Sequence, residues 1–161
     1  MVKVVQVVLF KKMDLPYFNK IIKEIFNLEK LGVITIIRFT NYDYQKLKLY
    51  NSFPDDFKYF LQKVGCVQIS LEDRYLLIAI MIEEVDQDDF DFLDFWTENS
   101  SLRLDSNKIF IARNVDSAFY AYHINENPVK IHEYCFSDRT YNNIFELLDD
   151  IVIEGCKQYK L

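Results

Sequence analysis

The stretch Ile109–Ser137, which reads IFIARNVDSAFYAYHINENPVKIHEYCFS, decides how we expect this chain to fold. Three β-type runs lie in and just before it, at Lys108–Ala112, Ala118–Ile124 and Val129–Phe136. The residues that separate these runs are rich in Asn, Asp and Pro, which favour turns because of their local hydrogen bonds or their fixed φ. The pattern predicts a three-stranded antiparallel meander.

The middle run of this meander is apolar on both of its faces. Side chains alternate along a strand, so one face holds Phe119, Ala121 and His123 and the other holds Tyr120, Tyr122 and Ile124. A strand of this kind is expected in the centre of a sheet, with other elements packed over each side.

The rest of the chain supplies helices and further strands. A capping Asp14 followed by Pro16 predicts a helix that ends at Gly32, and Ser52 with Pro54 predicts a second helix that ends at Gly65. We expect a short helix near Asn41–Asn51 and a last helix that begins at Thr140 and ends at Gly155. Strands are expected at Val2–Phe10, Val33–Phe39, Cys66–Leu71 and Arg74–Ile82, the first two of which could form a parallel crossover. The predicted fold class is α+β, a single domain with a largely antiparallel central sheet and helices packed against it.

Composition limits the classes of protein to which this chain could belong. Half of its 161 residues are hydrophobic, and Gly and Pro number only 3 each, which is typical of an ordered domain. Three widely spaced cysteines indicate buried thiols in a reducing compartment, and the apolar start is far shorter than the ~20 residues of a spanning helix. We therefore expect a cytoplasmic protein that does not enter a membrane.

Charge is unevenly distributed along the chain. Up to Lys63, eleven basic residues face six acidic ones, and from Val64 onward eight basic residues face nineteen acidic ones, for a net charge of −6. An acidic C-terminal part repels phosphate backbones and attracts basic partners. The charge argues against nucleic-acid binding and favours a basic protein partner.

The sequence lacks the motifs by which common catalytic and cofactor sites are identified. It has no Gly-rich phosphate loop, no GxSxG, no HExxH and no CxxC, so we expect no catalytic residue, no cofactor and no metal site. His132 and Cys135 form an H-x-x-C pair with His123 one strand away. Their odd spacing on one strand directs them to opposite faces, which argues against a shared metal ion and against a Cys–His nucleophile.

The segment Glu83–Glu98 combines acidic and aromatic residues and contains no Lys or Arg. One interpretation is a helix start, in which carboxylates offset the helix dipole while aromatic residues face the core. A second is a docking surface for a basic protein, and a third is a pair of catalytic carboxylates. The tyrosines of the meander could add to a recognition surface, although ordinary sheet composition explains them too. The residues that we predict to contact a partner are Asp86, Asp88, Asp89, Asp91, Asp94, Trp96, Tyr120 and Tyr122.

Two segments and the closing helix resemble the SUKH superfamily. Ser52–Gly65 (SFPDDFKYFLQKVG) is similar to the family's Leu-Pro helix, with Phe53-Pro54 in place of Leu-Pro. Pro128-Val129 and the aromatic run Phe119–Tyr122 resemble its second block, and the helix from Tyr141 to Ile151 resembles its last helix. The glycines that the family has before the aromatic strand are replaced here by Val115–Ala118.

This resemblance implies a single SUKH-like domain over residues 1–161, in which residues 1–40 could form an N-terminal strand–helix–strand extension. The superfamily includes a fungal cell-wall regulator and many bacterial immunity proteins. The resemblance therefore also implies a function, that of a non-catalytic protein-binding module. The expected role is an immunity protein that neutralises a basic toxin by direct binding. A carboxylate-dependent hydrolase and a regulatory scaffold protein are the alternatives.

Overall fold

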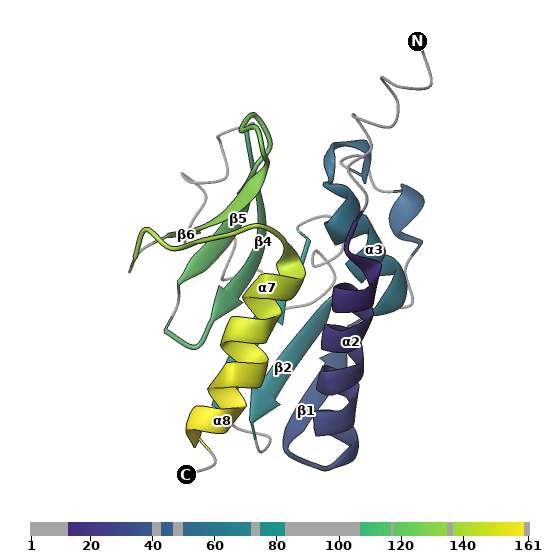
Figure 1. Cartoon of the computed structure of the whole chain (residues 1–161), viewed down its shortest axis with the longest axis vertical. Helices are drawn as coiled ribbons and strands as arrows, with labels where there is room; N and C mark the ends of the chain where they lie inside the picture. Colours follow the sequence, from purple (N-terminus) through teal and green to yellow (C-terminus); the bar gives the residue numbers. More distant parts are fainter. Residues whose placement is uncertain are drawn as a thin grey trace.

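The computed structural model in Figure 1 describes residues 13–39, 43–46, 50–71, 75–82, 107–116, 118–134 and 137–159. The predicted strand at Val2–Phe10 lies outside these residues. None of the helices in the described part is long and apolar enough to cross a membrane.

The described strands form one seven-stranded sheet in which chain order and spatial order are the same. Each strand pairs antiparallel with the next, so the sheet is a continuous meander. The predicted α+β class and the antiparallel meander are confirmed. The strands are β1 (Ile34–Arg38), β2 (Val67–Leu71), β3 (Tyr75–Ile80), β4 (Lys108–Asn114), β5 (Phe119–His123), β6 (Lys130–Tyr134) and β7 (Thr140–Tyr141).

The helices cover one face of this sheet. Figure 1 shows the first helix beside the C-terminal helical run, both of them in front of the strands. A π-helical segment, Asp149–Glu154, joins the two parts of that run, and short 3-10 turns lie at Tyr44–Lys46 and Tyr50–Ser52 where a short helix was predicted. The helices are α2 (Leu15–Lys30), α3 (Asp55–Lys63), α7 (Ile144–Leu148) and α8 (Gly155–Tyr159).

The main core lies between these helices and the sheet. Phe18 of α2 stacks on Phe145 of α7 with ring centroids 4.1 Å apart, and Phe57 of α3 packs near Tyr122 of β5 at 5.7 Å. Offset and tilted aromatic pairs at such distances contribute about 0.5–1.5 kcal/mol each beyond their buried area. Since Phe18 and other residues of α2 belong to this core, the helix within residues 1–40 packs with the rest of the described chain.

A second apolar cluster lies on the opposite face of the sheet. Its buried members come from β3, β4, β5 and the residue Met81, which follows β3. These strands are apolar on both faces, as the sequence pattern predicted for the middle strand. The members are Ala79, Met81, Phe110, Phe119 and Ala121.

The helix ends agree with the sequence in part. Asp14 caps α2 by accepting a hydrogen bond from the Tyr17 N–H, as predicted. The helix α3 begins later than expected, because Ser52 belongs to a 3-10 turn and Pro54 takes the capping position. The last helix is capped by Asn143, since Thr140 is used in β7.

The glycines were all predicted to end helices, and this is correct for two of them. Gly32 and Gly65 have φ of 75° and 88°, values that favour glycine. Gly155 instead lies at the first position of α8, where the helical run continues to Tyr159. The predicted helix end at Gly155 is therefore wrong.

Candidate functional site

The acidic residues predicted to bind a partner lie outside the described residues, as does Trp96. The structure describes the two strands that their segment connects. β3 and β4 pair directly, and the Met81 N–H donates to the Ile111 carbonyl oxygen at 2.8 Å. Directly paired antiparallel strands need a connection of about two to five residues. Residues 83–106 thus form an insertion far longer than this strand pairing requires.

Tyr120 and Tyr122 have no exposed surface. The Tyr120 hydroxyl donates to Glu133 Oε1 at 3.2 Å and accepts a hydrogen bond from Asn114 Nδ2 at 2.9 Å. The Tyr122 hydroxyl donates to Asp56 Oδ2 at 2.5 Å. Both rings belong to the main core, which corrects the expectation that they lie on a recognition surface. Ordinary sheet composition, the alternative, explains them.

Asp56 is a partly buried carboxylate that holds several elements together. Its Oδ2 accepts hydrogen bonds from the Tyr122 hydroxyl and, at 3.0 Å, from the Ile144 N–H at the start of α7. Burial raises the pKa of this carboxyl, and the hydrogen bonds that it accepts only partly oppose that rise. A perturbed carboxyl can indicate a catalytic site, but this one is occupied by groups that fix the fold.

The histidines of the chain number two, and the structure brings them together. Ala121 of β5 pairs with His132 of β6, so His123, two residues further along β5, is a diagonal neighbour of His132 on the same face. Their rings stack with centroids 3.7 Å apart and an interplanar angle of 17°. This face is the one that carries the second apolar cluster.

A carboxylate from the β5–β6 turn completes this group. Glu126 Oε1 lies 2.6 Å from His132 Nε2 and 4.0 Å from His123 Nδ1. The three ligand atoms all lie within 4.8 Å of one another, the one arrangement among the described residues that could hold a metal ion. We call His123, Glu126 and His132 the hairpin cluster.

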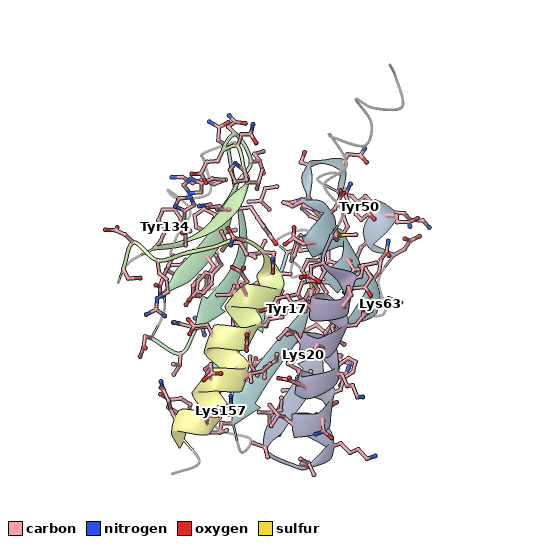
Figure 2. All side chains as sticks on the ribbon, viewed as in Figure 1. Tyr17, Lys20, Tyr50, Lys63, Tyr134 and Lys157 are labelled. Atoms are coloured by element: carbon pink, nitrogen blue, oxygen red, sulfur yellow. The ribbon has the colours of Figure 1, made fainter. Side chains whose placement is uncertain are left out.

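Neighbouring side chains orient the hairpin cluster. His123 Nε2 is within hydrogen-bond reach of the Tyr134 hydroxyl, while Lys108 Nζ lies 5.1 Å from the centre of the Tyr134 ring. Figure 2 shows Tyr134 on β6, away from Tyr17 and Lys20 of α2. Because His123 shares its face of β5 with Phe119 and Ala121 of the second apolar cluster, the site lies on the sheet face opposite the main core.

Spacing along a single strand, which relates His132 only to Cys135, does not reveal this cluster. Cys135 lies outside the described residues, and the two other cysteines, Cys66 and Cys156, are buried as predicted. The sequence feature that could have predicted the cluster is the hairpin formed by the second and third runs of the meander. Pairing the two strands across the turn at Asn125–Pro128 places both imidazoles and Glu126 at one end of it.

A second polar group lies at the C-terminal helical run. Arg139 Nη1 donates to Asp150 Oδ2 at 2.8 Å, and the Tyr141 hydroxyl donates to the same oxygen at 2.6 Å. Asp150 and Asp116 both line a cavity of about 270 Å³. Because Asp150 is held by two donors, the group is best described as an anchor between β7 and the helical run.

Comparisons with protein-family models, with curated proteins and with solved structures found no match. The likeness to the SUKH superfamily accordingly depends on the sequence segments quoted above.

Proposed function

We propose that this protein is a non-catalytic binding module that acts as an immunity protein, neutralising a basic toxin by direct binding. The observation that carries the proposal is the insertion of residues 83–106 between two strands that pair directly. Its first part, Glu83–Glu98, holds eight acidic residues, four aromatic residues and no basic residue. A short turn would be enough to join β3 to β4, so this strand pairing does not explain the length of the insertion.

The physical chemistry of binding supports this role. A dense negative patch speeds encounter with a cationic protein, and aromatic side chains that become buried in the complex slow its release. The sheet supplies a rigid base, because both strands that carry the insertion are buried and are hydrogen-bonded to neighbours on each side. A rigid base reduces the entropy lost on binding.

The described carboxylates favour binding over hydrolysis. Several that are partly buried serve as hydrogen-bond acceptors within the fold, as Asp56 does for Tyr122, Asp149 for Tyr17 and Asp150 for Arg139. A hydrolase would need two carboxylates that face an open cleft with room for a substrate. A regulatory scaffold would share the acidic surface and differ in its partner.

The direct test is co-expression with the product of the reading frame immediately upstream. If the proposal is correct, that product arrests growth when expressed alone, the chain restores growth, and the purified pair forms a stable complex. A product that leaves growth unaffected and does not bind the chain would contradict the immunity role. Binding without toxicity would favour the regulatory scaffold.

A further inference from the structure

We propose that the hairpin cluster binds a divalent transition-metal ion of the Zn²⁺ type through His123 Nδ1, Glu126 Oε1 and His132 Nε2. Two imidazoles and one carboxylate are a ligand set that suits such ions and leaves a fourth position open. The site is independent of the toxin-binding role proposed above.

The ligand atoms lie close to the spacing that a metal ion requires. Bonds of about 2.0–2.2 Å place the ligand atoms of a tetrahedral site roughly 3.3 Å apart. In the structure, the distances from Glu126 Oε1 to the two imidazole nitrogens are 2.6 and 4.0 Å, on either side of that value. An ion would replace the His132–Glu126 hydrogen bond and turn the two rings out of their stack.

The side chains are partly exposed, while hydrogen bonds hold the backbone that carries them. The exposed fractions of the His123, His132 and Glu126 side chains are 24%, 26% and 39%, so an ion can reach the site from solvent. The turn is held by the Glu126 N–H, which donates to the His123 carbonyl at 3.2 Å, and by the Ile124 N–H, which donates to the Asn107 carbonyl at 3.0 Å. The hairpin therefore holds the backbone of its ligands in place, and only the side chains would need to turn.

A hydrogen-bond partner outside the three ligands determines which imidazole nitrogen of His123 faces the metal ion. Its Nε2 faces the Tyr134 hydroxyl, which leaves Nδ1 directed toward Glu126. Metal-binding histidines commonly have such a partner on the second nitrogen, and its loss typically lowers metal affinity about 10–100-fold. Tyr134 is thus a positioning residue for the proposed site.

Two lysines limit the affinity of the site. Lys108 and Lys130 pair with His123 from the strands on either side of β5. Side chains opposite each other in a sheet share a face, so both lysines stand on the face of the sheet that holds the ligands and add positive charge there. Replacing Lys130 with Gln should therefore tighten metal binding several-fold, whereas the same change would weaken a site built for an anion.

The test uses the full-length chain without a tag, stripped of metal and titrated with Zn²⁺ and Co²⁺ by calorimetry and absorption. Because the chain has two histidines, imidazole nitrogen NMR signals report on this site directly. We expect one Zn²⁺ per chain at micromolar affinity, with both imidazoles shifted. Glu126→Gln should weaken binding by more than the about 10–100-fold that the loss of an outer partner costs, and His132→Ala should abolish it.

Matched variants show whether these three side chains alone hold the ion. Asp138→Asn removes an exposed carboxylate elsewhere and should leave the affinity for Zn²⁺ unchanged. Cys135→Ser should also leave it unchanged. Every variant is checked for an unchanged thermal midpoint. Loss of binding in Cys135→Ser would overturn the three-residue assignment. Binding weaker than millimolar in the unaltered chain, or imidazole signals that do not move with Zn²⁺, would overturn the site itself.

Discussion

Asp56 shows how a single side chain can join distant parts of this fold. It lies in the first turn of α3, and its carboxylate accepts hydrogen bonds from Tyr122 in β5 and from the start of α7. Burial raises the pKa of Asp56, and burial together with the negative charge of Asp56 raises the pKa of Tyr122. The tyrosine therefore remains a donor at neutral pH.

The raised pKa of Asp56 predicts a pH dependence of stability. The folded state binds this proton more tightly than the unfolded state, so the contribution of Asp56 to the free energy of unfolding is greatest at low pH. It is lost as the pH rises through the folded-state pKa. Asp56→Asn lacks this titration, so its stability relative to the unaltered chain should increase as the pH rises above about 4 and through the folded-state pKa of Asp56.

Urea unfolding across that pH range measures the effect. Asp55→Asn serves as the control, because it removes a neighbouring exposed carboxylate with the same change in charge. A stability difference between Asp56→Asn and the unaltered chain that stays constant with pH, or that falls as the pH rises, would refute the assignment.

At the scale of elements, local sequence signals placed most of the fold. Apolar and β-type runs bounded by turn residues predicted β2 to β6, and Asp14 with Pro16 predicted the start of α2. The errors arose where two local signals compete. Thr140 is a good helix cap, yet pairing with β6 uses its backbone. The helix is capped by Asn143 instead, whose side chain accepts hydrogen bonds from the Phe145 and Glu146 N–H groups.

The ends of α2 and α3 offer a matched prediction. Both stop at a glycine with positive φ, which costs an alanine about 1–2 kcal/mol. At Gly32 nothing lies within 4 Å of an added Cβ, whereas at Gly65 the Cβ would lie 2.9 Å from the Tyr44 hydroxyl. That hydroxyl accepts a hydrogen bond from the Cys66 N–H at 2.9 Å.

Gly65→Ala should therefore lower the free energy of unfolding by about 1 kcal/mol or more beyond the loss in Gly32→Ala. The added Cβ displaces the Tyr44 hydroxyl and so weakens its hydrogen bond with the Cys66 N–H. Chemical denaturation of both variants gives the two values. Equal losses would show that the close contact with Tyr44 has no energetic consequence.

At the scale of the whole molecule, the sequence predicted the scaffold better than the sites. Strand and helix periodicity depend on neighbours in the chain, so they can be read without coordinates. The hairpin cluster depends on strand register, and the Asp56 network joins residues 88 positions apart. The acidic segment Glu83–Glu98 could be identified from composition alone, because a high density of charge along the chain does not depend on the fold.

Association rates with the upstream gene product test whether residues 83–98 capture a basic protein. The test variant changes Asp88, Asp89, Asp91 and Asp94 to Asn. The control makes an equal change in charge at four exposed positions elsewhere, Asp43, Asp116, Asp138 and Glu154.

At about 20 mM salt, where screening is weak, the test variant should associate at least about tenfold more slowly than the control, and the gap should narrow as salt is added. Both variants should keep the thermal midpoint of the unaltered chain. Equal association rates for the test variant and the control would contradict a role of Glu83–Glu98 in capturing the partner.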